Sequence, residues 1–102
     1  SLSIDYGKLD YHFTAFIGIL LTKSNRTQEV LRELVEIPNV IEASVISGKY
    51  NIFCKIRAKN TEDAKRIIYQ IDDIQDVMRT ESMISMEEYI SDKNRLIAAV
   101  SI

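Results

Sequence analysis

Residues 50–58 read YNIFCKIRA and show the clearest alternation of apolar and polar side chains in the chain. The apolar series is Ile52, Cys54, Ile56 and Ala58, and it alternates with Asn51, Phe53, Lys55 and Arg57. Because successive side chains of a strand point to opposite faces, this period of two predicts a strand over residues 50–58. Gly48 and Lys49 precede it as a turn, so the apolar stretch 40–47 is predicted to be the other strand of a hairpin.

Two amphipathic helices are predicted, one before and one after this hairpin. Residues 61–71 carry apolar side chains at i, i+3, i+4 and i+7, and Asn60 stands at the N-cap position. The four apolar positions are Ala64, Ile67, Ile68 and Ile71. Residues 26–36 show similar spacing. We expect Ser24 and Asn25 to cap this helix, with Gln28 as the capping-box partner of Asn25.

The first and last strands of the domain are predicted over residues 13–22 and 77–87, which are rich in apolar and β-branched residues. Since residues 13–22 are apolar on both faces, this strand is expected at the centre of the sheet. Residues 13–88 would then form the domain. Residues 1–12 would be an N-terminal arm, and the tail 89–102 is either a short helix or an additional strand.

The two halves of the chain repeat with an offset of 37 residues. The matched pairs are Phe16 with Phe53, Val30 with Ile67, Leu31 with Ile68, Leu34 with Ile71, Ile37 with Ile74 and Val40 with Val77. Each half is a βαβ unit, and two such units predict an α+β, ferredoxin-like βαββαβ sandwich of the kind found in dimeric α+β barrels. Its antiparallel sheet would have the first and third strands in the middle and both helices on one face.

This register leaves apolar side chains on the sheet face that has no helix. If Ile52, Cys54 and Ile56 face the helices, then Phe53 points the other way. The side chains predicted on the open face include Phe16, Leu20 and Phe53. An exposed apolar patch of this kind usually meets another protein surface. We therefore expect the open face to be a homodimer interface.

The overall composition fits one globular domain of 102 residues, with 46% hydrophobic and 27% charged residues. Thirteen basic residues stand against fifteen acidic ones and are scattered along the chain, which argues against DNA binding by this chain itself. The longest apolar run, Phe13 to Leu21, is too short to span a bilayer, and no basic leader precedes it. A cytoplasmic protein without a membrane partner is expected.

Few residues in this sequence suggest catalysis. Cys54 and His12 are the only cysteine and histidine, so neither a disulfide nor a Cys/His metal site can form within the chain. We expect Cys54 to be a buried thiol and His12 a packing or surface residue. The three glycines are isolated, which excludes a glycine-rich phosphate loop. The expectation is a protein that is not an enzyme and holds no cofactor or metal.

The turn at Gly48 is a candidate ligand site. Glycine there has either the plain hairpin role or presents backbone N–H groups to a ligand, with neighbouring polar side chains around it. Thr80 and Ser82 place two hydroxyls on one face of the last strand, where they are either ordinary strand residues or hydrogen-bond donors to a small polar ligand.

Three segments carry a resemblance to a known family. FTAFI at residues 13–17, following Lys8 and Leu9, resembles the start of the effector domain of Lrp/AsnC-type transcription regulators. SGKYN at residues 47–51 and VMRTES at residues 77–82 resemble the hairpin and the closing strand of the same domain. The resemblance extends in order from about Lys8 to Glu87.

The resemblance implies a small-molecule sensing and oligomerisation domain, known in the family as the RAM domain. Family members dimerise through their open sheets and often assemble further into tetramers or octamers, with amino acids or related metabolites bound near the hairpin and the last strand, at contacts between dimers. The ligand residues carried over are Ser47, Gly48, Tyr50, Asn51, Thr80 and Ser82. Asn51 stands where the family usually has an aspartate, which would pair with a ligand's ammonium group, and Ser82 replaces a threonine.

The resemblance also leaves alternatives open. The family's regulators contact DNA through an N-terminal helix-turn-helix that this sequence lacks, so the chain is either part of a longer regulator or a stand-alone RAM protein. A ligand-free assembly module is a second possibility. A small dimeric α+β barrel enzyme is a third, and a pocket that places His12 beside an acidic partner would favour it.

Overall fold

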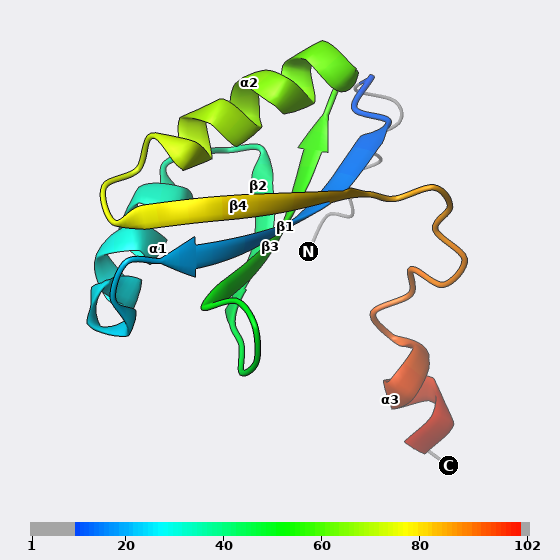
Figure 1. Cartoon of the computed structure of the whole chain (residues 1–102). Helices are drawn as coiled ribbons and strands as arrows, with labels where there is room; N and C mark the ends of the chain where they lie inside the picture. The colour runs from blue at the N-terminus through cyan, green and yellow to red at the C-terminus, as the bar shows by residue number, and fades with distance from the viewer. Residues whose placement is uncertain (1–9, 101–102) are drawn as a thin grey trace.

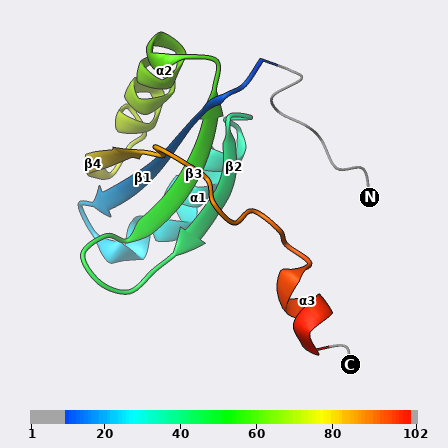
Figure 2. The ribbon, with the colours of Figure 1, turned by 90° about the vertical axis from the view of Figure 1, so that its right-hand side faces the viewer.

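A computed structural model of the chain describes residues 10–100 (Figure 1). Its elements follow the order β1 (Phe13–Leu21), a 3₁₀ turn η1 (Ser24–Arg26), α1 (Thr27–Val35), β2 (Val40–Val45), β3 (Ile52–Ala58), α2 (Thr61–Asp72), β4 (Val77–Ile84) and α3 (Arg95–Val100). The sheet has the strand order β2-β3-β1-β4 with every pair antiparallel, and α1 and α2 cover one of its faces (Figures 1 and 2). The predicted ferredoxin-like fold is confirmed.

The core lies between the sheet and the two helices. The predicted alternation of buried and outward-facing residues is found along the whole of β3. The four helix-facing residues of β3, Ile52, Cys54, Ile56 and Ala58, are at most 1% exposed, and the residues between them are half-buried on the other face. From β1 the core takes Ala15, Ile17, Ile19 and Leu21, and from the helices Val30, Leu34, Ala64, Ile67 and Ile71. The members of the 37-residue repeat occupy equivalent places, since Val30 and Ile67 are both buried and Leu31 and Ile68 are both half-buried.

The two helices begin in different ways. The Asn60 side chain accepts a hydrogen bond from the Asp63 N–H at 2.8 Å, which confirms the predicted cap of α2. The capping box predicted at Asn25 and Gln28 is wrong. A 3₁₀ turn precedes α1, and the Thr27 hydroxyl donates to the Ser24 carbonyl at 2.6 Å. The sharp connection from β1 uses these residues for its own turn, so no side chain caps α1.

All four strands are shorter than predicted, β1 by a single residue at its end. β4 ends at Ile84 rather than at residue 87, because Ile84 already pairs with Ala15, close to the start of β1. β2 ends at Val45 and β3 begins at Ile52, so the hairpin is a loop of residues 46–51 rather than a two-residue turn. This loop, called here the 46–51 loop, is closed by a hydrogen bond from the Ile46 N–H to the Asn51 carbonyl at 3.2 Å.

After β4 the chain runs along the open side of the sheet and ends in α3 (Figure 2). Glu88 holds this segment to the sheet, with its carboxylate 3.0 Å from an Arg57 nitrogen and 3.7 Å from the Lys55 Nζ. Of the predicted arm 1–12, residues 1–9 lie outside the described part of the chain. Within residues 10–100, no helix is long and apolar enough to cross a membrane.

Candidate functional site

The 46–51 loop projects from one end of the sheet, with Ser47, Gly48 and Lys49 exposed. Gly48 has a φ of +108°, a conformation that a residue with a side chain rarely adopts. No atom lies within 4 Å of where its Cβ would be, so the backbone conformation rather than lack of space requires glycine. The loop therefore offers exposed backbone groups in a fixed geometry.

Asn51 joins this loop to the sheet through both its backbone and its side chain. Its N–H donates to the Ile19 carbonyl at 2.9 Å, and its Oδ1 accepts from the Leu21 N–H at 2.9 Å. Because the amide oxygen is used internally, the Nδ2 donor is the group that Asn51 can offer to a ligand. An aspartate at this position could accept the same bond and present a carboxylate oxygen in place of that donor.

Tyr50 lies across the open face of the sheet. Its ring packs on Gly18 of β1, where an added Cβ would be 2.8 Å from ring carbons, and its hydroxyl donates to Glu81 of β4. The hydrogen bond to the Glu81 carboxylate raises the pKa of Tyr50. Gly18 and Glu81 are contacts that sequence reasoning missed, although a glycine inside a strand signals a close approach by another group.

Thr80 and Ser82 lie on the helix-facing side of β4, opposite Ile19 and Ile17 in the register. They share one face of the strand, as predicted, and the Thr80 hydroxyl donates to the Asp72 carboxylate at 2.6 Å. Two strands, β3 and β1, separate β4 from β2, so these hydroxyls are not beside the turn at Gly48 within one chain. A site that contains both sets needs two copies of the chain.

The open face carries the aromatic pair expected from the register. The rings of Phe16 and Phe53 stack with centroids 5.8 Å apart and an interplanar angle of 14°. Both rings are half-buried, Leu20 is also half-buried, and neither α1 nor α2 covers this face (Figure 2). The Lys55 Nζ lies 5.7 Å from the Phe16 ring centroid and completes the polar edge of the patch.

Comparison with known proteins identifies the family. Residues 14–95 match the model of the Lrp/AsnC ligand binding domain. The chain belongs to this family. The resemblance to Lrp/AsnC regulators that the sequence motifs indicated is thereby confirmed. The matched residues include the sheet, the two helices that cover it and the start of the tail.

Two curated relatives of this Lrp/AsnC domain are named regulators. The regulatory protein AsnC of Haemophilus influenzae is 32% identical over 88 residues, which cover 85% of this chain and 59% of the relative. The HTH-type transcriptional regulator FL11 of Pyrococcus furiosus is 32% identical over 79 residues, covering 78% of this chain and 52% of the relative. The domain thus spans somewhat more than half the length of these relatives.

Solved structures support the same assignment. Escherichia coli AsnC superposes with a TM-score of 0.85 at 26% identity, over 91% of this chain and 63% of that one. TTHA0845 from Thermus thermophilus matches with a TM-score of 0.71 at 29% identity, over 78% of this chain and 99% of that one. A feast or famine regulatory protein of M. tuberculosis, solved in complex with L-methionine, shares the fold with a TM-score of 0.80 at 19% identity.

The two residues considered for catalysis lie apart in this Lrp/AsnC domain. The His12 Nε2 is 3.7 Å from an Asp10 oxygen, but both side chains are exposed, by 68% and 85%, on the surface. Cys54 is 1% exposed within the core. Its burial raises the pKa of the thiol to about 12. The histidine is therefore a surface residue and the cysteine a packing residue.

The buried Cys54 thiol should be inert in the folded domain. We expect no reaction with Ellman's reagent at pH 8 until denaturant is added, because the thiolate is the reactive species. Folding raises the pKa of Cys54, so the unfolded chain loses the thiol proton at a lower pH than the folded domain does. The free energy of unfolding therefore falls as the pH rises above the pKa of the thiol in the unfolded chain. At one pH unit above that value, wild type should lose about 1.4 kcal/mol relative to Cys54→Ala, measured by urea denaturation. Parallel pH profiles for the two proteins would contradict this expectation.

Proposed function

We propose that this domain is the effector-sensing and assembly part of an Lrp/AsnC-type transcription regulator. It would bind a small amino-acid-like metabolite between the 46–51 loop of one copy and β4 of another. The match of residues 14–95 to a ligand-binding family carries this proposal, and the exposed loop supports its position. The proposed ligand contacts are Ser47, Gly48, Tyr50, Asn51, Thr80 and Ser82.

The chemistry of these contacts favours a small polar ligand that carries a carboxylate. The exposed turn at Gly48 supplies backbone N–H donors, and Asn51 supplies its Nδ2 because Leu21 occupies its oxygen. Thr80 donates its proton to Asp72, so its oxygen is left as an acceptor for a ligand N–H. The methionine complex of a protein with this fold supports an amino acid as the class of ligand.

The assembly part of the proposal rests on the open sheet face. Stacked, half-buried Phe16 and Phe53 form an apolar centre with no helix over it. A second copy that packs face to face would bury these rings and direct both helix layers outward. The sheet-face dimer would place the effector sites at its periphery, where contact with a further copy can bring β4 to the 46–51 loop.

Calorimetry and thermal shift against the twenty amino acids and common nucleotides test the sensing function. A ligand present at a hundred times its dissociation constant should stabilise the domain by about 2.7 kcal/mol, which raises the Tm by several degrees. An amino acid that gives this shift supports the proposal. Absence of any shift at millimolar concentrations would instead favour the ligand-free assembly module.

Gly48→Val should remove effector binding and leave the sheet-face dimer folded. The valine is strained at positive φ, at a cost of about 1–2 kcal/mol, and it reshapes the loop backbone. Titration calorimetry should show at least a tenfold weaker affinity for the effector than in wild type. Lys49→Val, a change at the adjacent exposed position, is the matched control and should bind normally. If Gly48→Val binds as wild type does, the 46–51 loop is not the effector site.

Asn51→Asp should increase the preference for ligands that carry an ammonium group. The carboxylate can keep the bond from the Leu21 N–H and replaces a neutral donor with a charged acceptor. We expect about tenfold tighter binding of the free amino acid, with no gain for its N-acetyl derivative, measured by calorimetry. Equal gains for both compounds would show that position 51 does not contact the ammonium group.

A further inference from the structure

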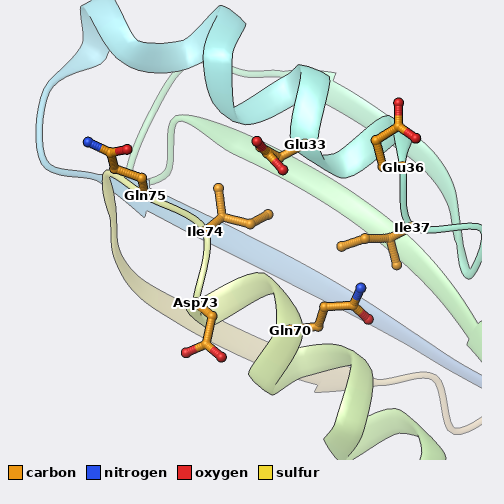
Figure 3. A pocket seen from close by; sticks show the side chains of 7 residues that line it. All are labelled: Glu33, Glu36, Ile37, Gln70, Asp73, Ile74 and Gln75. Atoms are coloured by element: carbon orange, nitrogen blue, oxygen red, sulfur yellow. The ribbon is translucent and has the colours of Figure 1, made fainter.

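A groove of about 280 Å³ lies between α1 and α2, on the side of the domain away from the open sheet face. Ile37 and Ile74 lie at its centre, and Glu33, Glu36 and Asp73 line its rim, with the carboxylates of Glu36 and Asp73 pointing away from the isoleucines (Figure 3). None of these carboxylates forms an ion pair with another described residue. The groove therefore combines an apolar centre with three uncompensated negative charges.

The position of this groove follows from the internal repeat. The offset of 37 residues relates Glu33 to Gln70, Glu36 to Asp73 and Ile37 to Ile74. Each half of the chain thus contributes one residue from the last turn of its helix and two residues that directly follow the helix. The groove lies on the pseudo-twofold axis that relates the two βαβ units. None of its lining residues comes from the 46–51 loop or from the open face.

Helix α3 presents the complementary surface. It has only six residues, and a helix this short is not stable without packing. Leu96 and Val100, four residues apart on one face, are 72% and 70% exposed. Arg95 begins the helix and Lys93 lies two residues before it; both are exposed and make no ion pair within residues 10–100. An apolar face that begins with two positive charges fits an apolar groove lined by carboxylates.

We propose that α3 of one copy docks in the α1–α2 groove of a second copy. Its leucine and valine would pack on half-buried Ile74, beside Ile37 in the floor of the groove, and its basic residues would meet the carboxylates. In both views α3 lies far from α1 and α2, on the open side of the sheet, so the helix is directed away from the groove of its own chain (Figures 1 and 2). Because a sheet-face dimer leaves the grooves facing outward, this contact joins one dimer to the next.

Cysteine cross-linking tests which chain supplies the helix. We would mix Ala99→Cys protein with Gln70→Cys protein, both in a Cys54→Ala background, and oxidise them gently. The expected product is a disulfide between position 99 of one chain and position 70 of another. Glu62→Cys, at the opposite end of α2, is the matched control and should give little product. No preference for position 70 over position 62 would overturn the proposal.

Charge reversal tests the same contact without any cross-link. Sedimentation velocity of wild type should show species larger than a dimer, and Glu36→Lys with Asp73→Lys should reduce them to dimers. Lys93→Glu with Arg95→Glu should do the same, whereas all four changes in one chain should restore the larger species. Glu62→Lys is the control and should assemble as wild type does. The proposal fails if wild type never exceeds a dimer, or if neither reversal changes the assembly. These measurements use no effector, so failure of the sensing function would not affect them.

Discussion

Substituting aspartate for Phe16 and Phe53 is expected to convert the proposed sheet-face dimer into monomers. The two rings stack on each other and are half-buried within one chain, so a face-to-face partner would cover the rest of their surface. At about 1 kcal/mol for each of four half-covered rings, the dimer loses about 4 kcal/mol, or roughly a thousandfold in dissociation constant. Introduced carboxylates would add repulsion across the interface. Sedimentation equilibrium measures the change directly.

The domain should remain folded in this variant, because both side chains point away from the core. Far-UV circular dichroism of the monomer checks this point. Tyr69→Asp replaces another aromatic residue, 57% exposed on α2, and should leave dimerisation unchanged. If the double aspartate variant dimerises like wild type, the open face is not the dimer interface. The proposed arrangement of the effector sites would then also be wrong.

Gly18→Val should give the second large effect, on stability rather than on assembly. The new Cβ would lie 2.8 Å from the Tyr50 ring, so the ring must leave the sheet and lose its hydrogen bond to Glu81. We expect the free energy of unfolding to fall by about 2–3 kcal/mol in urea denaturation. Valine favours strands more than glycine does, so the loss would come from this collision.

The same substitution in a Tyr50→Ala background provides the control for Gly18→Val. With the ring removed, the valine at position 18 has nothing to displace and should be neutral or stabilising. A double-mutant cycle therefore should show strong coupling between the two positions. An equal loss in both backgrounds would mean that the backbone of β1, and not the Tyr50 ring, requires glycine.

Local patterns predicted most of the fold correctly. The alternation in residues 50–58 and the helical spacing in residues 61–71 each depend on neighbours along the chain, and both elements formed where expected. The errors occurred at the ends of elements. The capping box at Asn25 failed because a 3₁₀ turn takes up those residues, and β4 stops early because it has reached the start of β1.

The candidate site was predicted only in parts. The exposed turn at Gly48 and the shared face of Thr80 and Ser82 followed from sequence, and the predicted order of the strands already separates them by two strands. Tyr50 was expected near a ligand, and the structure shows its hydroxyl bound to Glu81 across β1. No local pattern contains that contact, since its partners are 31 residues apart.

The sequence by itself determined the order of the elements, the side of each element that enters the core, and the family, because these depend on periodicity and on short ordered motifs. Only the tertiary structure decided that the Asn51 oxygen is occupied by Leu21, that Tyr50 packs on Gly18, and that the repeat forms an acidic groove between α1 and α2. These features arise where strands and helices distant in the chain meet, and their chemistry depends on distances that the linear sequence does not contain.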